Sequence, residues 1–303
     1  MASITSKGIL NLAVVYVIWG STYLAIRIAV REGAGFPPFA LAASRVLAAA
    51  SILFVWTVLR RGRLRPSRGE LVVLAGSGVL MWVGGNGLVT WAETRADSGL
   101  AALIVGIMPI WAVLIESIID RRVPSKKLMV SLLLGFAGVA LLFRPVLREG
   151  IGGDLPSLVA LVLAPLWWAL GSIWLQRRPT KLGILAISAW QQFFGGLAFL
   201  VLMFAFREPL PTPTGEAWLA WIYLVVFGSV LAFSSYMVVL RLLPVQIGMT
   251  YAYANPVIAV FLGWMILSEQ VTLWTFGGAA FVVLGIAGVL NNTLEKQRAL
   301  SDV

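Results

Sequence analysis

Ten long apolar runs, separated by short polar segments, constrain this chain more than any other feature of its sequence. The runs cover residues 8–30, 37–59, 71–91, 98–119, 128–143, 155–175, 182–206, 217–240, 247–267 and 271–290. A helix needs about 20 residues, with a range of about 17–25, to cross the roughly 30 Å hydrocarbon core of a bilayer. Only the fifth run, with 16 residues, is shorter, and we expect its basic flank to reach the interface. Strand-type alternation is missing, so the pattern predicts an all-α membrane protein with ten transmembrane helices.

The composition excludes a water-soluble fold. Of the 303 residues, 60% are hydrophobic and only 12% are charged, whereas a soluble domain carries about 25% charged residues. Ten spans leave only short loops, so there is no room for a soluble catalytic domain. The first run is too long for the apolar region of a signal peptide, and no small-residue cleavage site follows it, so we interpret it as an uncleaved first span.

The residue inventory argues against enzyme chemistry. The chain has no Cys and no His, which excludes disulfides, thiolate nucleophiles, His-based triads and imidazole metal sites. No Walker A motif is present, and no span contains a paired Asp or a Ser–Lys combination. We therefore expect no catalytic residue, no metal and no cofactor. An integral-membrane transferase or protease is the enzyme alternative, and it lacks a recognisable catalytic constellation.

The basic residues predict the orientation of the chain. Sixteen of the 23 Lys and Arg residues lie on the side that holds the two termini and the loops leading from even- to odd-numbered runs. The other side holds five, and Arg27 and Arg45 lie inside runs. The positive-inside rule therefore places both termini in the cytoplasm. Because the net charge of +10 is explained by orientation, we do not expect nucleic-acid binding.

Three short matches indicate an internal duplication. They pair residues 134–139 with 284–289, Pro109 with Pro256, and Gly20-Ser21 with Gly171-Ser172, at offsets of 150, 147 and 151. The sequence thus predicts two five-helix repeats, residues 1–148 and 149–303. Since each repeat has an odd number of spans, the second must enter the membrane from the opposite side. Inverted repeats are typical of secondary transporters, in which two bundles expose a midplane site alternately to each side. A duplicated scaffold that moves no solute is the alternative.

Several segments resemble the drug/metabolite transporter superfamily, in its ten-helix EamA-type branch. The motifs are residues 17–27 with Trp19-Gly20-Ser21, Pro37-Pro38-Phe39 with Ala43-Ser44-Arg45, and Asn255-Pro256-Val257 followed by Ser268-Glu269 and residues 285–288. At the end of the fourth run, residues 119–122 depart from the Leu-Gly-Glu-Arg-like sequence that is usual in the family. This departure weakens any argument that the two repeats carry a symmetric pair of acidic residues. The resemblance implies export across a bacterial inner membrane. It also implies a cavity lined by the first, third, fourth, sixth, eighth and ninth spans, with the fifth and tenth as buttresses. The aromatic content resembles the YddG-type exporters of aromatic amino acids.

The character of the cargo follows from what the spans contain. The first, third, sixth, eighth and ninth runs carry no acid in their middle, which argues against an exporter of organic cations. Arg27 and Arg45 lie in different runs without counterparts in the second half, which argues against a phosphate carrier. We therefore expect a neutral or zwitterionic small molecule. Nucleosides and drugs are the alternative cargoes.

Aromatic and polar residues at helical spacing are the candidate substrate contacts. Trp82 and Asn86 share a helix face, as do Trp168 and Ser172, and Tyr251 and Asn255. The full predicted set is Trp19, Tyr23, Trp82, Asn86, Trp168, Ser172, Tyr236, Tyr251 and Asn255. Aromatic walls with a few amide and hydroxyl groups suit an aromatic side chain and an amino-acid head group. Ordinary packing between helices explains any one of these residues equally well.

Prolines and in-span charges complete the predicted site. Pro109 and Pro256 lack an N–H, so the carbonyls of Val105 and Ala252 lose their helical partners and could accept a substrate ammonium group. A kink that only shapes packing is the alternative. Arg45 is expected to snorkel or to bond carbonyls, and Glu116 and Glu269 to cap a helix or act in a gate. The expected partners are a small-molecule substrate and the lipid bilayer. The oligomeric state stays open, and a monomer is compatible with the sequence.

Overall fold

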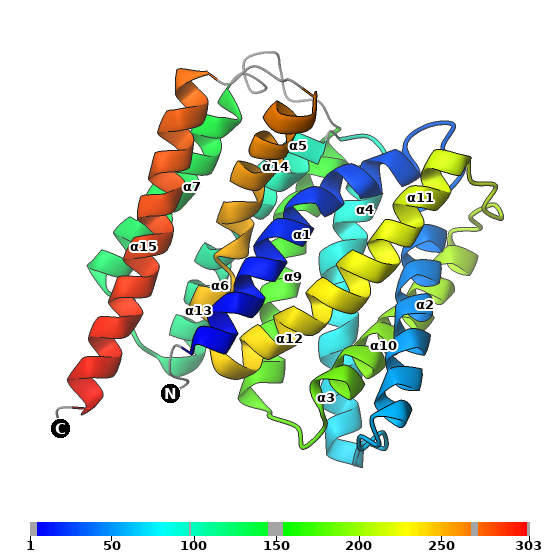
Figure 1. Ribbon diagram of the computed structural model, residues 1–303, viewed down its shortest axis with the longest axis horizontal. Helices are drawn as coiled ribbons and strands as arrows, with labels where there is room; N and C mark the ends of the chain where they lie inside the picture. The colour runs from blue at the N-terminus through cyan, green and yellow to red at the C-terminus, as the bar shows by residue number, and fades with distance from the viewer. Residues whose placement is uncertain (1–4, 97, 145–153, 268–271, 302–303) are drawn as a thin grey trace.

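The computed structural model, which describes residues 5–96, 98–144, 154–267 and 272–301, is helical throughout and contains no strand in these ranges. Eight helical segments are long and apolar enough to cross a membrane. Helices α7 and α14, with 17 residues each, complete the ten segments that the sequence predicts. The start of α1 and the end of α15 lie at the same end of the bundle (Figure 1).

The helix bounds agree with the apolar runs to within a few residues, apart from the last helix, which continues past its run. The first half contains α1 (Ser6–Val30), α2 (Pro38–Leu59), α3 (Arg68–Val79), η1 (Leu80–Gly87), α4 (Leu88–Ala92), α5 (Ser98–Val105), α6 (Met108–Asp120) and α7 (Lys126–Leu142). The second half contains α9 (Leu155–Arg177), α10 (Ile184–Ala205), α11 (Gly215–Tyr223), η2 (Leu224–Ala232), α12 (Phe233–Leu242), α13 (Val245–Gly248), α14 (Tyr251–Leu267) and α15 (Leu273–Ser301).

Polar side chains at the loop ends start several of the helices. Each accepts a hydrogen bond from a main-chain N–H in the first turn, which would otherwise lack a partner. The residues are Thr5, Ser67, Ser125, Asp154 and Thr214. Ser67 and Glu70 form a complete capping box. These caps fix where α1, α3, α7, α9 and α11 begin.

The third and the eighth spans are irregular in the same way. Both change from α- to π-helical geometry in the middle, over η1 in one and η2 in the other, and then return to an α-helix. π-Helical turns displace a helix face and occur frequently at functional sites.

The fourth and the ninth spans are interrupted instead. Residues 106–107 separate α5 from α6, and residues 249–250 separate α13 from α14.

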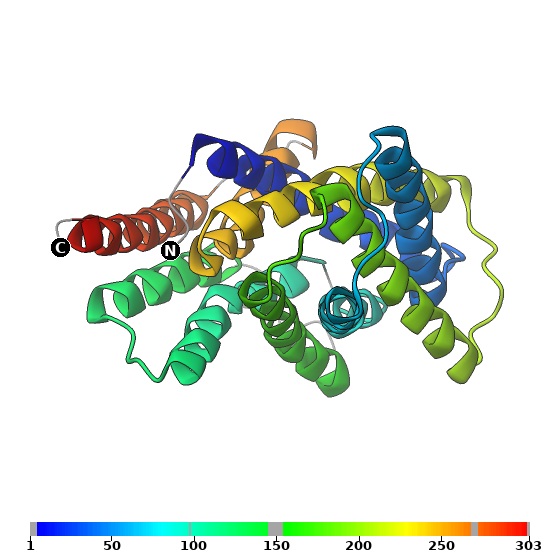
Figure 2. The same ribbon diagram turned by 90° about the horizontal axis from the view of Figure 1, so that it is seen from below.

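Helices α7 and α15 pack against each other along their length, to one side of the other helices (Figures 1 and 2). Glycines make this close approach possible. A Cβ on Gly285 would lie 2.5 Å from the Cα of Gly135, and a Cβ on Gly138 would lie 2.7 Å from the carbonyl oxygen of Gly278. Small residues let transmembrane helices approach at backbone distance in this way. The pair matches the buttress position that the family resemblance implies for these spans.

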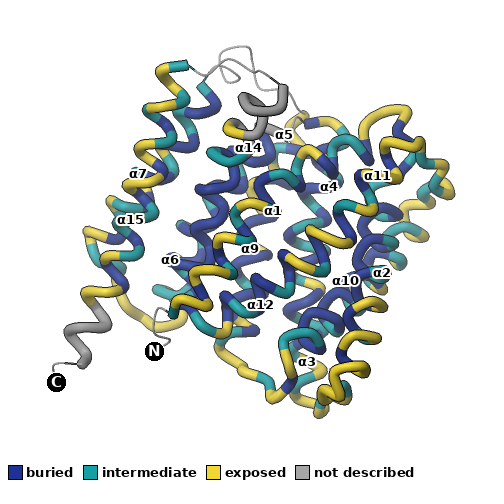
Figure 3. Tube along the Cα trace, viewed as in Figure 1, coloured by how far each residue is buried: buried dark blue, intermediate teal, exposed yellow. Residues whose placement is uncertain are grey.

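Burial is concentrated in the middle of the molecule, on α9, α12 and the start of α14, whereas α15 and the outer side of α2 are largely exposed (Figure 3). The exposed side chains include large apolar ones, such as Val17, Leu24, Val55 and Val130. Exposed apolar residues on every outer helix are expected where lipid, rather than water, surrounds the protein.

Candidate functional site

A cavity of about 60 Å³ lies at the centre of the helical bundle. Seven of the nine predicted substrate contacts line it: Trp19, Tyr23, Trp82, Asn86, Trp168, Tyr251 and Asn255. The volume is enough for a few water molecules but far below the roughly 300–1,000 Å³ of a pocket for a drug-sized ligand. The cavity as it stands is therefore too small for a metabolite.

The walls of this central cavity are a connected cluster of aromatic rings. The Trp19 ring centroid lies 5.4 Å from that of Trp168 and 4.8 Å from that of Tyr251, both in edge-to-face geometry. Trp82 meets Trp168 at 6.1 Å, again edge to face. Aromatic pairs in this geometry hold one another in place. Because the rings come from α1, η1, α9 and α14, the cluster joins the two halves of the chain at the cavity.

Two polar atoms at the cavity have no hydrogen-bond partner among the described residues. They are the indole nitrogen of Trp82 and the amide oxygen of Asn86. Buried polar groups are nearly always paired, since leaving one unpaired costs about 1–3 kcal/mol. A donor and an acceptor are thus available to a molecule in the cavity.

Asn255 occupies the opposite wall, on α14. The side-chain nitrogen of Asn255 donates to the carbonyl oxygen of Tyr251 at 2.9 Å and to that of Tyr16 at 3.1 Å. The Tyr16 hydroxyl in turn lies 2.6 Å from the Thr250 hydroxyl. These contacts fix α1 against α14 at the break between α13 and α14.

The other two predicted contacts, Ser172 and Tyr236, lie behind the cavity wall. Their hydroxyl oxygens are 2.9 Å apart, and Ser172 also donates to the carbonyl oxygen of Trp168. Tyr236 is fully buried and packs against Trp19, with ring centroids 5.1 Å apart. The structure thus gives both residues a supporting position and no place in the lining.

Replacing Tyr236 by Phe should therefore change transport little. The ring and its packing on Trp19 remain, and the hydroxyl contacts with Ser172 and with the Met249 sulfur are lost. A lost hydrogen bond costs roughly 0.5–1.5 kcal/mol of stability. We expect the KM of transport to stay within about twofold of the unmodified protein while the unfolding temperature falls slightly. A rise in KM of tenfold or more in a flux assay would place the Tyr236 hydroxyl on the substrate.

Two expectations about the lining helices are wrong. The eighth span does not line the cavity. It lies one layer behind, where the Gly228 carbonyl accepts a hydrogen bond from the Trp19 indole nitrogen at 3.1 Å. The second span does line it, through Arg45.

Arg45 neither snorkels nor bonds a carbonyl, because its side chain is buried and its Nε donates to the Ser229 hydroxyl at 2.8 Å. The hydroxyl on η2 thus holds the guanidinium at the cavity.

The prolines act differently in the two halves. Pro109 lies in the first turn of α6, directly after the break that follows α5, so the chain is interrupted at the predicted carbonyl of Val105. Val105 itself lines the cavity. Pro256 lies inside α14, and Ala252, whose carbonyl it frees, is buried between the cavity residues Tyr251 and Asn255. The break in the fourth span thus lies at the cavity, and the role of the Val105 carbonyl as an ammonium acceptor stays a prediction.

One buried charge escaped the sequence reasoning. Glu93, two residues past the third apolar run, is fully buried, and neither of its carboxylate oxygens accepts a hydrogen bond from a described residue. Its amide N–H donates to the carbonyl oxygen of Val89, which lines the cavity one turn earlier. A short polar stretch after an apolar run is typical of a loop, so nothing in the sequence distinguished Glu93 from a solvated residue.

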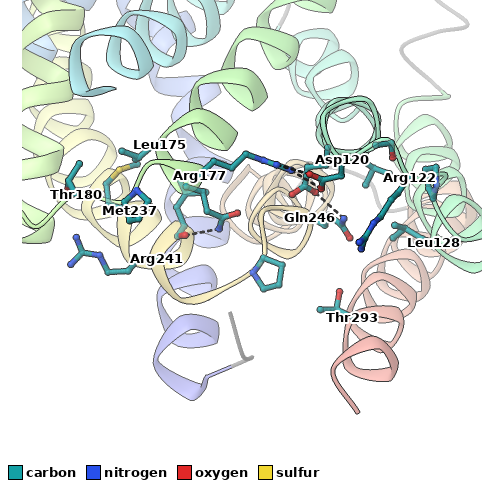
Figure 4. Close-up of a pocket in the computed structure, with 18 of the residues that line it drawn as sticks. Asp120, Arg122, Leu128, Leu175, Arg177, Thr180, Met237, Arg241, Gln246 and Thr293 are labelled. Atoms are coloured by element: carbon teal, nitrogen blue, oxygen red, sulfur yellow. Dashed lines mark hydrogen bonds and ion pairs between the residues drawn. The ribbon is translucent and has the colours of Figure 1, made fainter. Parts of the chain in front are cut away.

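A second, larger hollow of about 540 Å³ opens at the end of the bundle that holds the termini. Figure 4 shows its walls, where Arg177 at the end of α9 forms two hydrogen bonds, of 2.7 and 2.8 Å, with Asp120 at the end of α6. Gln246 on α13 donates to Glu116 at 3.0 Å. Met237, next to Tyr236, lines the hollow. Glu116 thus lies in a polar network at the wall of this hollow. The other predicted acid, Glu269, lies outside the described residues.

Comparison with known proteins identifies the family of the chain. The model of the EamA-like transporter family matches residues 6–144 and again residues 155–291. The chain belongs to the EamA-like transporter family. Proteins of this family are transporters and not enzymes.

Curated relatives of this family member cover most of its length. The protein named "Uncharacterized inner membrane transporter YedA" from Escherichia coli (strain K12) is 33% identical over 250 residues, which are 82% of this chain and 79% of YedA. "Uncharacterized transporter YoaV" from Bacillus subtilis (strain 168) is 25% identical and covers 92% of this chain and 95% of its own. "Protein PecM" from Dickeya dadantii (strain 3937) is 27% identical, covering 93% and 91%.

A solved crystal structure superposes on the chain with a TM-score of 0.77, covering 98% of this chain and 99% of the other at 21% identity. This likeness shows the fold, an all-helical membrane bundle of the EamA type.

Proposed function

We propose that this EamA-like transporter exports small neutral or zwitterionic metabolites, with aromatic and hydrophobic amino acids as the main class, across the inner membrane. The central cavity is the observation that carries the proposal. Trp19, Trp82, Trp168 and Tyr251 offer aromatic surface, and the unpartnered Trp82 indole nitrogen and Asn86 amide oxygen offer a donor and an acceptor. An apolar pocket with a few convergent polar groups is typical of a site for an amphipathic small molecule.

The mechanism that we propose is alternating access between two inverted repeats, residues 1–148 and 149–303. The π-helical segments of the third and eighth spans and the interrupted fourth and ninth spans are shared irregularities that support a common origin of the repeats. The contracted cavity supports a cycle with a closed state, since no metabolite fits without separation of the helices. The wide hollow near Asp120 and Arg177 would be the mouth on the side of the termini.

Flux through proteoliposomes tests the function directly. Purified protein is reconstituted and offered a panel of radiolabelled amino acids, nucleosides and organic cations. We expect saturable flux of phenylalanine or tryptophan, with little flux of organic cations. Flux of nucleosides or drugs without amino acids would reassign the cargo, and absence of flux for the whole panel would support a scaffold. Tags accessible on opposite faces at the two termini would contradict an inverted pair with both ends in the cytoplasm.

Replacing Pro109 or Pro256 by Ala tests the main-chain carbonyls of Val105 and Ala252 as ammonium acceptors. Alanine at position 109 supplies an N–H that can bond Val105 and rejoin α5 to α6, and alanine at 256 does the same for Ala252 within α14. We expect the KM for amino compounds to rise about tenfold, which corresponds to about 1.4 kcal/mol of lost binding. Pro156→Ala, in the exposed first turn of α9 and away from the cavity lining, is the proline control. An unchanged KM in both variants would remove the carbonyls from the site.

A further inference from the structure

Two opposite charges are buried beside the central cavity, and among the described residues neither forms an ion pair. One is the guanidinium of Arg45 on α2, and the other is the carboxyl of Glu93 at the end of α4. Helix α4 ends on the side of the molecule away from the start of α1 (Figure 1). Charged residues inside a membrane protein are expensive to bury and usually mark a functional site.

Arg45 is fixed in place but has free donors. Only its Nε donates a hydrogen bond within the described structure, to the Ser229 hydroxyl at 2.8 Å, although a guanidinium carries five N–H groups. Its Cζ lies 5.6 Å from the ring centroid of Trp82, which orients the plane of the group. Since Arg45 lines the cavity, its terminal nitrogens are available to a ligand there.

Glu93 is the complementary group. Both of its carboxylate oxygens are buried and accept no hydrogen bond from any described residue. Arg27 on α1 donates to the main-chain oxygen of Glu93, which holds this residue against α1. The carboxyl interacts electrostatically with Arg27 and, next, with Arg45, and it also interacts with Tyr23. Arg45 and Tyr23 both line the cavity. Val89, one turn before Glu93 on the same helix face, lines it as well.

From this arrangement we propose that Arg45 and Glu93 form a two-point clamp for the head group of a free α-amino acid. The substrate carboxylate binds the terminal nitrogens of Arg45, and the substrate ammonium binds the carboxylate of Glu93. The clamp rests on the proposed function, because it names the part of the substrate that the cavity recognises. The aromatic walls at Trp19, Trp82 and Trp168 then receive the side chain of the substrate.

A zwitterion accounts for both orphan charges at once. Burying a charge is costly unless it is paired and hydrogen-bonded. A simple anion would pair Arg45 and leave the Glu93 carboxyl without a hydrogen-bond partner, and a simple cation would leave the terminal nitrogens of Arg45 without one. A ligand that carries both groups satisfies both residues and adds no net charge to the membrane interior. A cargo with no net charge is therefore preferred because the site carries one positive and one negative side chain, and not because the site lacks charged residues.

Two analogues that each lack one charged group test the clamp. Phenethylamine is phenylalanine without its carboxylate, and 3-phenylpropionate is phenylalanine without its ammonium group, so neither adds bulk. Their inhibition of phenylalanine uptake is measured in proteoliposomes containing the full chain. We expect the unmodified protein to prefer phenylalanine over each analogue by about a hundredfold or more, because a missing partner leaves a buried charge unpaired.

Each variant should relax one preference and keep the other. Arg45→Gln is expected to lower the preference over phenethylamine at least tenfold and to leave the preference over 3-phenylpropionate unchanged. Glu93→Gln is expected to do the reverse. The matched controls are Arg31→Gln and Glu216→Gln, which remove the members of an exposed ion pair of 2.6 Å, and both should keep the unmodified ratios.

Arg45→Lys serves if Arg45→Gln does not fold, since lysine keeps the charge but loses the planar donor geometry, and a smaller shift in the same ratio is expected. Ratios that stay unchanged in Arg45 and Glu93 variants which still transport phenylalanine would overturn the clamp and leave the proposed function standing. Absence of amino-acid flux by the unmodified protein would overturn both.

Discussion

Trp168→Ala is expected to raise the KM for an aromatic amino acid by about tenfold to a hundredfold, whereas Trp167→Ala should change it less than threefold. A factor of ten corresponds to about 1.4 kcal/mol of binding free energy, which is a modest share of what a buried Trp contributes. Trp168 is buried, lines the central cavity and meets Trp19, Trp82 and Tyr236. Trp167, the next residue on α9, is 36% exposed and does not line the cavity.

The pair of variants separates binding from folding. Truncating a buried Trp costs about 3–5 kcal/mol of stability, so transport must be normalised to monodisperse protein in the proteoliposomes. Trp168→Phe keeps most of the ring area and removes the indole nitrogen, and we expect it to show an intermediate KM. Equal KM values for Trp168→Ala and Trp167→Ala would mean that the cavity does not bind the substrate.

Gly285→Leu should lower the free energy of unfolding by about 3 kcal/mol or more, while Gly277→Leu should leave it within about 0.5 kcal/mol. A Cβ on Gly285 would lie 2.5 Å from the Cα and 2.6 Å from the nitrogen of Gly135, so only a separation of α7 from α15 can accommodate it. Gly277 lies on the same helix, and a Cβ there would have nothing within 4 Å.

Thermal or chemical unfolding in detergent measures this difference, with the amount of protein in the membrane as a second readout. Both variants place the same side chain on α15, so membrane partitioning and helix propensity are matched between them. Equal stability of the two variants would show that the close approach of α7 and α15 is dispensable. A loss of transport by Gly285→Leu at unchanged stability would instead assign this helix pair a part in the transport cycle.

Much of the candidate site followed from helical spacing. Trp82 and Asn86 lie four residues apart on one helix face, as do Tyr251 and Asn255, and all four line the same cavity. The spacing could not separate Trp168 from Ser172, because the first faces the cavity and the second turns its hydroxyl to Tyr236. Periodicity identifies a face of a helix, but neighbouring helices decide what that face meets.

The second and eighth spans show the same limit. From the sequence, Arg45 is expected to lie near a membrane surface. In the structure the hydroxyl of Ser229 on η2, 184 residues further along the chain, holds its guanidinium at the cavity. From its sequence position Tyr236 is expected to contact the substrate, yet it packs against the lining residue Trp19 and is not part of the lining itself. Both outcomes depend on which helices become neighbours, and no local pattern encodes that.

The sequence by itself determined the number, length and approximate bounds of the membrane-spanning helices, because transfer of an apolar segment into lipid depends on the composition of that segment alone. It also determined that the chain could build no thiol or imidazole site. Only the tertiary structure decided that Glu93 is buried near Arg45, and that seven predicted residues share one cavity. The physical reason is that burial of a polar group depends on contacts between helices that are distant in the chain, and these are settled by packing.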